Sequence, residues 1–330
     1  MNRTYLVTGG TGFIGSALVR RLVADGHRVR VFDDNSRGRT DRLAPVDGRF
    51  EFHPGDIRDL DAVKRAVRGV DAVCHLAFIN GTEFFYTRPE LVLDVAVKGM
   101  SNVLDACIES GVRELLLTSS SEVYQSPAVI PTDETVPLVI PDVFNPRYSY
   151  AAGKLINEVM AINYGRKHFD RVVIVRPHNV YGPDMGWEHV VPQLVLRMHA
   201  LAASTEEPVP FPIQGDGTQS RSFIYIDDFT DGLMLAMERG DHLSIYHVGT
   251  MDELTIADVS RAVGAYFGRT IRIVPASLPA GGTNRRCPDT AKISRLGFHP
   301  RFSFRDGLAL TAAWYVAHAD RAPQERSLPA

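Results

Sequence analysis

Short runs of apolar residues alternate with longer amphipathic stretches over the first half of the chain. The short runs are bounded by glycine, proline or polar residues, as buried parallel strands are, and the long stretches repeat apolar residues at helical spacing. The expected strands are Tyr5–Val7, Arg28–Phe32, Phe50–Phe52, Ala72–His75, Glu114–Thr118 and Arg171–Val175. The expected helices between them are Phe13–Asp25, Asp59–Arg68, Pro89–Ser110 and Tyr150–His168. This alternation predicts an α/β fold with a doubly wound parallel sheet that helices cover on both faces.

The pattern changes after Arg176, where prolines and glycines become frequent up to Gly217. Later segments return to regular spacing: helices are expected at Val191–Ala203, Asp227–Glu238, Thr255–Phe267 and Asp306–His318, and a strand at Ile271–Val274. We predict a first domain over residues 1–176 and a smaller C-terminal α/β lobe over residues 177–320, with some segments returning to the first domain. Residues 321–330 are expected to form a flexible tail.

Composition and charge narrow the class of protein. The 330 residues are 45% hydrophobic and 23% charged, and the net charge of −3 gives no general attraction to nucleic acid or to an anionic membrane. No apolar run reaches the ~20 residues of a membrane span. Met1 leads straight into a strand, so we expect no signal peptide and a cytoplasmic location. The three cysteines show neither metal-binding nor disulfide spacing, and no metal is predicted.

A glycine-rich turn follows the first expected strand. Residues 5–15 read Tyr-Leu-Val-Thr-Gly-Gly-Thr-Gly-Phe-Ile-Gly, so Gly9, Gly12 and Gly15 open a helix that begins near Phe13. The first N–H groups of such a helix are free to bind a phosphate, and glycines let a pyrophosphate approach the main chain closely. No Lys-Ser or Lys-Thr pair follows, which argues against a nucleoside-triphosphate loop. The turn predicts a Rossmann-type dinucleotide site, with Phe13 and Ile14 beside it.

An acidic residue stands at the distance at which such a site holds a ribose. Asp33 ends the second expected strand, eighteen residues after Gly15, and Asp34 and Asn35 follow it. A carboxylate there accepts hydrogen bonds from the ribose hydroxyls of adenosine and repels a 2′-phosphate, so NAD is favoured over NADP. Two arginines a few residues further on, Arg37 and Arg39, weaken the preference for NAD over NADP. The alternative interpretation of Asp33 is a solvated turn residue.

A tyrosine and a lysine on the helix expected at Tyr150–His168 are candidates for proton transfer. Tyr150 and Lys154 are four residues apart and therefore share a helical face. An ammonium close to the phenol is expected to lower the pKa of Tyr150, so that the tyrosine can take a proton from a sugar hydroxyl while a hydride leaves the same carbon. A serine after a neighbouring strand, within Ser119–Ser121, can hydrogen-bond the same oxygen.

The order of these motifs resembles that of the extended short-chain dehydrogenase/reductases, in particular their nucleotide-sugar epimerase/dehydratase branch. The resemblance extends to about Tyr315, and the segments that carry it are Thr8–Gly15, Gly55–Ile57, His75–Ala77, Ser119–Tyr124, Tyr150–Lys154, Arg176–Pro183, Gly215–Gly217, Arg221–Asp228 and Arg286–Asp289. It implies a Rossmann-type NAD-binding domain, a nucleotide-sugar-binding lobe, and a homodimer formed by the helices that hold Gly99 and Tyr150.

The resemblance also implies roles for single residues. Tyr150 is the base, Lys154 holds the nicotinamide ribose, and Ser120 hydrogen-bonds the substrate hydroxyl. Further cofactor contacts are implied at Asp56, Ile57, Leu76, Ala77, Thr118 and His178. The diphosphate of the substrate would be held by Asn179, Arg221 and Arg286, with a surface ion pair as the alternative for the two arginines. Other substrate contacts are expected at Thr82, Glu83, Tyr86, Ser121, Trp187, Glu188, His189, Val191 and Gln214.

Two positions depart from the pattern of the branch. Ala96 stands where an asparagine is usual, so the contribution of that side chain to helix geometry or to a proton relay must come from elsewhere. Glu122 stands where simple C4-epimerases usually carry a small or apolar residue, and a carboxylate there can abstract the proton next to a 4-keto group. Ser121 replaces the aspartate that thymidine-sugar 4,6-dehydratases use for the loss of water. A capping or solvated role is the alternative for Glu122.

We therefore predict an NAD-dependent nucleotide-sugar epimerase that acts through a transient 4-keto sugar. The second hypothesis is a nucleotide-sugar 4,6-dehydratase or a UDP-glucuronate-type decarboxylase that uses Glu122. The third is a non-catalytic NAD-binding sensor, but relatives of that type usually lose the Tyr150–Lys154 pair, and both residues are present. The nucleotide, the sugar and the carbon that is inverted stay open.

Overall fold

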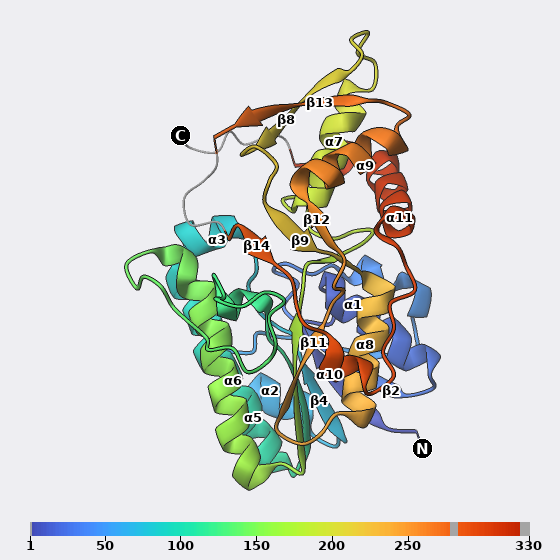
Figure 1. Ribbon diagram of the computed structural model, residues 1–330. Coiled ribbons are helices and arrows are strands. Elements are labelled where there is room, and N and C mark those ends of the chain that lie inside the picture. Colours follow the sequence, from blue (N-terminus) through green and yellow to red (C-terminus); the bar gives the residue numbers. More distant parts are fainter. Residues whose placement is uncertain (1, 278–282, 324–330) are drawn as a thin grey trace.

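A parallel sheet of seven strands forms the centre of the larger part of the molecule (Figure 1). The computed structural model describes residues 2–277 and 283–323. The strands lie in the order β3-β2-β1-β4-β5-β6-β11, and every pairing between them is parallel. Their bounds are β1 Thr4–Thr8, β2 Arg28–Asp33, β3 Glu51–Pro54, β4 Ala72–His75, β5 Glu114–Thr118, β6 Arg171–Pro177 and β11 Ser244–Val248. The predicted fold class is confirmed.

Helices cover both faces of the sheet, because successive side chains of a buried strand point to opposite faces. Leu6 of β1 packs into the core under α2, α5 and α6, whereas its neighbour Val7 packs into the core under α1 and α8. The bounds of these helices are α1 Phe13–Ala24, α2 Leu60–Val67, α5 Met100–Ser110, α6 Ser149–His168 and α8 Ile226–Arg239. The short helix α10 (Ala291–Ser294) lies against β11 on the second of these faces.

Strand β11 was not predicted from the sequence. It is the edge strand next to β6, its first two residues are partly exposed, and Ser244 and His247 interrupt the apolar run. Because β11 comes from residues 244–248, the main sheet includes a segment from beyond residue 176. The division into domains stays a prediction. Of the predicted tail, residues 324–330 lie outside the described residues, and Ala319–Arg321 form a single turn.

The long helix predicted at Pro89–Ser110 contains a π-helical turn. It consists of α4 (Pro89–Asp94), the turn Val95–Gly99, and α5. The turn holds Ala96, which faces Gly153 of α6 so closely that a Cβ on Gly153 would lie 2.7 Å from the Cβ of Ala96. A π turn is a local insertion that often marks a functional site, and here it lies where the two helices approach each other.

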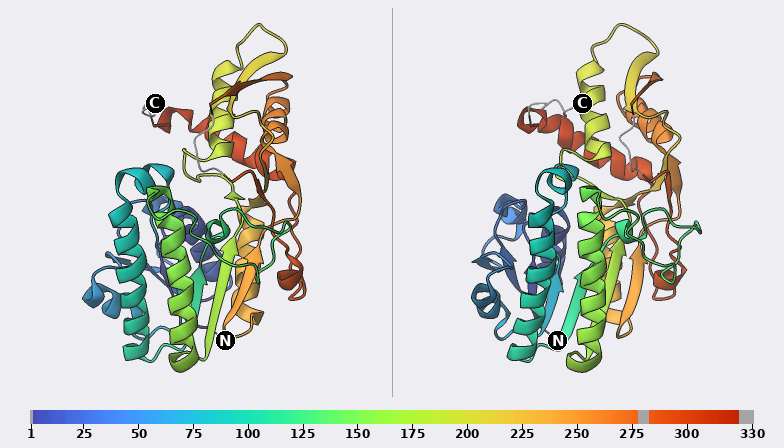
Figure 2. Two further views of the ribbon diagram at one scale, coloured as in Figure 1. Left: turned by 60° about the vertical axis from the view of Figure 1, so that its left-hand side comes forward. Right: turned by 90° about the vertical axis from the view of Figure 1, so that its left-hand side faces the viewer.

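A smaller lobe lies at one end of the sheet (Figure 2). Its core packs side chains of three helices, such as Leu194, Val259 and Leu308, against strand residues such as Phe211. The helices of the lobe are α7 Val190–Leu201, α9 Ile256–Tyr266 and α11 Phe304–Ala317. Its strands are β8 Val209–Gln214 paired with β13 Ile271–Ala276, and β9 Ser220–Ser222 between β12 Glu253–Thr255 and β14 Arg285–Arg286. The pair β7 Val180–Tyr181 and β10 Ile224–Tyr225 joins the lobe to the sheet, and α3 (Thr82–Thr87) follows β4.

Within the described ranges, no helix is both long and apolar enough to cross a membrane. The same ranges contain no group of three or more histidine, cysteine or acidic side chains that could hold a metal ion. Cys74, Cys107 and Cys287 are all buried and unbridged, as expected from their spacing.

Candidate active site

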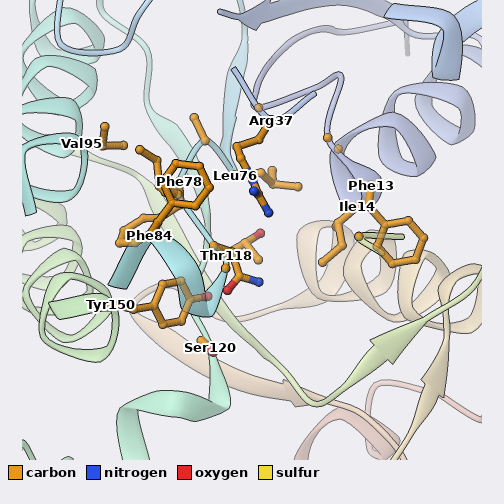
Figure 3. A pocket seen from close by; sticks show the side chains of 18 of the residues that line it. Phe13, Ile14, Arg37, Leu76, Phe78, Phe84, Val95, Thr118, Ser120 and Tyr150 are labelled. Atoms are coloured by element: carbon orange, nitrogen blue, oxygen red, sulfur yellow. The ribbon is translucent and has the colours of Figure 1, made fainter. Parts of the chain in front are cut away.

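A cavity of about 820 Å³ lies where the carboxyl ends of several strands meet the small lobe. It is lined by the glycine turn after β1, the residues that follow β2, β4 and β5, the start of α6, and a loop of the lobe around Glu188. Figure 3 shows it from close by, with the aromatic rings of Phe78, Phe84 and Tyr150 on one side and Phe13 and Ile14 on the other. Ligands of open α/β sheets bind at this position.

The glycine turn is shaped for a pyrophosphate. Gly9 has a φ of +71°, and a Cβ there would lie 2.7 Å from the main-chain nitrogen of Ala77. A Cβ on Gly15 would overlap the carbonyl oxygen of Gly9, so only glycine lets α1 begin this close to β1. Gly12 caps α1 without a side-chain acceptor, which leaves the first N–H groups of the helix free for an anion.

Asp33 at the end of β2 is held by the main chain. One of its carboxylate oxygens accepts a hydrogen bond from the amide of Thr11 at 3.0 Å, and the other accepts from the amide of Asn35 at 2.9 Å. Each oxygen keeps a further lone pair, so a pair of ribose hydroxyls can bind on the cavity side. The residues present therefore fit the ribose and pyrophosphate of a dinucleotide.

Tyr150, Ser120 and Lys154 come together beside this turn. The hydroxyl of Tyr150 points into the cavity near Ser120 (Figure 3), and the ring packs between Phe78 and Phe85 at 5.2 and 5.0 Å between centroids. The ammonium of Lys154 donates to the carbonyl oxygen of Thr118 at 2.8 Å and lies 4.0 Å from the centre of the Phe78 ring. The three side chains predicted to carry the chemistry therefore line one wall.

The pKa of Tyr150 is shifted in the direction opposite to the sequence prediction. Burial raises it to about 12, which outweighs the lowering effect of the Ser120 hydroxyl. Burial also lowers the pKa of Lys154 to about 7, against the opposing charge of Glu158. The predicted lowering rested on neighbouring positive charge, whereas in the structure both groups are removed from water and each favours its neutral form.

Glu122 and Arg286 form an ion pair in the cavity wall, with 2.6 Å between oxygen and nitrogen. Burial alone would raise the pKa of Glu122, but the Arg286 guanidinium holds it below its usual value, so the carboxylate is charged. Arg147 and Arg221 add positive charge around the same carboxylate, and burial with the charge of Arg286 lowers the pKa of Arg221 to about 10. This wall is suited to an anionic ligand.

Most of the residues that the sequence selects line this cavity. They are Gly9, Gly12, Phe13, Ile14, Gly15, Asp33, Asp34, Asp56, Ile57, Leu76, Ala77, Thr82, Thr118, Ser120, Ser121, Glu122, Tyr150, Lys154, Asn179, Glu188, His189 and Arg286. The walls formed by the described residues do not include Asn35, Glu83, Tyr86, His178, Trp187, Val191, Gln214 or Arg221. The individual roles of all these residues stay predictions.

Several of the residues outside the cavity wall have other partners. Trp187, expected to stack on a base, packs against Trp314 and Tyr315 at 5.7 and 5.0 Å between ring centroids. Val191 is fully buried in the core of the small lobe. The guanidinium of Arg221 donates to main-chain carbonyls, among them that of Ser220 at 2.7 Å. The structure thus brings these side chains to packing or main-chain contacts.

The cavity wall also contains residues that were not among those selected from the sequence, and Phe78 and Arg147 are two of them. Phe78 follows directly after the predicted strand-end motif and contacts Tyr150 and Lys154, so its position next to that motif was a usable signal. Arg147 lies three residues before Tyr150 and lines the same cavity, so its closeness to Tyr150 in the sequence was a usable signal. Arg37, one of the two arginines considered above only for the choice between NAD and NADP, pairs with Glu188 of the lobe at 2.6 Å, and no local sequence pattern links these two positions.

The sequence pattern of the NAD dependent epimerase/dehydratase family matches residues 5–249. The chain belongs to this family. UDP-glucuronic acid decarboxylase 1 of Arabidopsis thaliana is 33% identical over 308 residues, which are 92% of this chain and 67% of that protein. The crystal structure of dTDP-glucose 4,6-dehydratase from Streptomyces venezuelae with NAD bound aligns with a TM-score of 0.85 and 32% identity, over 96% of this chain and 98% of the other. UDP-glucose 4-epimerase from Thermotoga maritima, solved with UDP-glucose, aligns with a TM-score of 0.84 and 27% identity, over 96% and 99%.

The family confirms that the chain is an enzyme and that its cofactor is NAD. The glycine turn and the Asp33 carboxylate provide the shape and hydrogen bonds that this cofactor needs. The three relatives differ in reaction, because one is a decarboxylase, one a dehydratase and one an epimerase. Family membership therefore leaves the reaction class open.

Proposed function

We propose that the chain is a nucleotide-sugar epimerase that acts through a transient 4-keto sugar. The observation that carries the proposal is the convergence of Ser120, Tyr150 and Lys154 on the cavity wall beside the dinucleotide-shaped glycine turn. The epimerase from Thermotoga maritima, which was solved with UDP-glucose, supports the substrate class. A homodimer and a cytoplasmic location remain predictions from the sequence.

In this proposal Tyr150 takes the proton of the C4 hydroxyl and later returns it. Bound NAD supplies the site that accepts and gives back a hydride. The Ser120 hydroxyl orients the sugar oxygen, and Lys154, tied to the Thr118 carbonyl, provides a donor beside the phenol. The phenol has a pKa of about 12 here, so proton transfer needs additional positive charge in the occupied site.

The other wall is proposed to hold the diphosphate. Arg286 is 5% exposed and also donates to the Thr283 hydroxyl at 3.0 Å, so its fork is fixed before a ligand binds. Asn179 lies on the same wall, and its amide donates to the Ser222 carbonyl at 2.8 Å. Planar guanidinium groups suit phosphate oxygens because they pair with two oxygens at once.

A second candidate function is favoured by Glu122. Its charged carboxylate lies in the cavity wall near Tyr150, where a base can remove the proton next to a 4-keto group. The paired Arg286 can hold a sugar carboxylate, as a decarboxylase requires. The decarboxylase and dehydratase relatives support such a base, but Ser121 offers no carboxylic acid for a 4,6-dehydratase of the Asp-Glu type.

The products of the reaction decide between these candidates. The purified protein is incubated with UDP-, GDP-, dTDP- and CDP-sugars, including uronic acids, in water and in deuterium oxide, and products are analysed by mass spectrometry and proton NMR. The proposal expects an isomer of unchanged mass with inverted C4. Loss of water or of carbon dioxide would instead establish the second candidate. Absence of turnover with every sugar, while NAD is bound, would contradict both and favour a sensor.

A further inference from the structure

Three side chains of α6 reach three consecutive residues at the end of β5. Tyr150 interacts with Ser120, Lys154 donates to the Thr118 carbonyl at 2.8 Å, and Glu158 accepts from the Ser119 hydroxyl at 2.5 Å. The three helical residues are four positions apart, so they form one stripe along a face of α6. Two members of the stripe are the proposed catalytic pair, and the third, Glu158, has no assigned role.

Glu158 is fully committed to buried partners. It is 2% exposed, and its carboxylate accepts two hydrogen bonds from Arg176 of β6, at 2.8 Å from Nε and 2.5 Å from Nη2, besides the one from Ser119. Arg176 is also 2% exposed. A bidentate pair of this kind fixes distance and orientation together, so α6, β5 and β6 meet at one rigid point.

The network continues away from the cavity. The remaining Arg176 nitrogen donates to the Tyr124 hydroxyl, and that oxygen lies 2.7 Å from Nε2 of His247 on β11. All of these side chains are buried, and their hydrogen bonds satisfy one another. Helix α6, which carries Tyr150 and Lys154, is therefore connected through Glu158 to the edge strand β11.

Stability alone does not explain a fully buried ion pair. The loss of hydration of two charges roughly cancels their attraction, and apolar residues of the same shape often serve as well. What an apolar pair cannot do is fix Ser119, and with it the neighbouring Ser120 and Thr118, at a set distance from α6. We propose that Glu158 is a positioning residue, which holds Tyr150 and Lys154 in register with the substrate-binding end of β5. This inference rests on the proposed function.

The charge of Glu158 also acts on Lys154. Glu158 and Tyr150 face Lys154 from its own helix, and the Thr118 carbonyl faces it from β5. His75 of β4 is also close to Lys154, but burial and the charge of Lys154 lower the pKa of His75 to about 3, so His75 is neutral. Arg176 is hydrogen-bonded to Glu158 and reaches Lys154 only through that carboxylate. Burial lowers the pKa of Lys154 and Glu158 opposes this, so removing the carboxylate charge moves loss of the Lys154 proton to lower pH.

The test compares Glu158→Gln with Ser119→Ala and with a control, Asp228→Asn. Gln keeps the shape of Glu158 and one acceptor oxygen, but it replaces the other oxygen with a donor and removes the charge. Ser119→Ala removes one hydrogen bond without leaving an unpaired charge. Asp228 of α8 is an equally buried carboxylate on the other face of the sheet, which accepts from the amides of Arg301 and Phe302 at 3.0 and 2.9 Å. All four proteins are assayed with the sugar nucleotide that wild type converts, from pH 6 to 10.

We expect Glu158→Gln to lower kcat by about tenfold or more with KM changed less than about twofold, because misplacement acts on the reacting geometry. The alkaline limb of kcat shifts to lower pH. Ser119→Ala lowers kcat by about fivefold, the worth of one hydrogen bond, even if Glu158→Gln does not fold. Asp228→Asn lowers thermal stability and leaves kcat and the pH profile of the folded enzyme unchanged. Equal kcat values and pH profiles in Glu158→Gln and Asp228→Asn would overturn the proposal.

A second readout does not need turnover. In protein labelled with ¹⁵N-lysine, the Lys154 signal is assigned by its loss in Lys154→Met and titrated by NMR in wild type and in Glu158→Gln. A titration midpoint at lower pH in Glu158→Gln supports the role of Glu158, and an unchanged midpoint contradicts it. If wild type converts no sugar nucleotide, the proposed function fails, and the titration alone still decides whether Glu158 controls Lys154.

Discussion

The cofactor end of the cavity is shaped chiefly by main chain and by the Asp33 carboxylate that the main chain holds, whereas the substrate end is formed by charged side chains. At the first end, Gly9 and Gly15 allow close backbone approach, and amides fix Asp33 in place. At the second end, Glu122 and Arg286 meet from positions 164 residues apart in the chain. One end depends on a single continuous turn, and the other depends on how distant segments are packed together.

This difference predicts which end of the cavity changes more easily by single substitutions. A site made of main chain changes only when the backbone moves, so the dinucleotide turn constrains the whole β1–α1 unit. A site made of side chains can change its chemistry by single substitutions that leave the fold intact. The decarboxylase, dehydratase and epimerase relatives fit this expectation, since they align over nearly the whole of this chain.

The largest effect is expected at the side-chain end, from Tyr150→Phe. Loss of the phenol removes the proposed proton acceptor, and general acid–base groups contribute about 10²–10⁴-fold to turnover. We expect kcat to fall by that factor while NAD affinity, measured by calorimetry, stays within about twofold. Tyr164→Phe, on the same helix but outside the cavity wall formed by the described residues, is the control. Near-normal turnover of Tyr150→Phe would remove the basis of the proposed mechanism.

At the main-chain end, Gly15→Ala is expected to weaken NAD binding by about thirtyfold, because its Cβ would overlap the Gly9 carbonyl and displace the turn. Calorimetric titration of the NAD-free protein measures the effect. Gly232→Ala is the matched control, since its Cβ would crowd side chains of Val248 and Phe298 far along α8. Gly232→Ala should lose stability but retain NAD affinity. If Gly15→Ala and Gly232→Ala lose NAD affinity equally, the loss comes from general destabilisation of the fold and not from the shape of the glycine turn.

A third prediction tests the buried ammonium between the two ends. An unfolded lysine keeps its proton to about pH 10.4, whereas burial lowers the pKa of Lys154 to about 7 in the folded protein. Between these values the unfolded state binds more protons, so this group makes stability rise with pH. Relative to Lys154→Met, the free energy of unfolding of wild type should increase by roughly 1 kcal/mol per pH unit across that window. Urea titrations from pH 7 to 10 measure the difference, and a constant difference would mean that Lys154 stays charged when buried.

The cofactor end could be predicted from sequence because its parts are contiguous. Strand, glycine turn and helix lie within residues 4–24, and Asp33 follows at a fixed distance. The other strands of the main sheet and its longer helices were predicted for the same reason, whereas the edge strand β11 and the short helix α10 were not. The π turn in the long helix was not predicted either, and it lies where Ala96 meets Gly153 of α6.

The substrate end was predicted only as a set of residue types. Glu122 and Arg286 were selected separately, and their pairing depends on how β14 of the small lobe packs against the turn Ser121–Tyr124 that follows β5. For Trp187, an aromatic residue in a polar loop suggested base stacking, whereas the structure packs its ring against Trp314 and Tyr315, partners that no local pattern indicates. Glu158 was within reach of the sequence analysis, because it continues the Tyr150–Lys154 spacing by one further turn.

The smallest effect, and the one that separates the two candidate functions, is expected from Glu122→Gln. Gln keeps a hydrogen-bond acceptor for Arg286 but cannot act as a charged base. A C4-epimerase needs no base at the neighbouring carbon, so kcat should change by less than about threefold, well below the about 10²–10⁴-fold contribution of a general base. Glu253→Gln is the control. Glu253 also pairs with an arginine, Arg285, but it lies outside the cavity wall formed by the described residues. A fall in kcat of about a hundredfold or more, together with loss of deuterium uptake from solvent, would instead make Glu122 the proton-abstracting base of the second candidate.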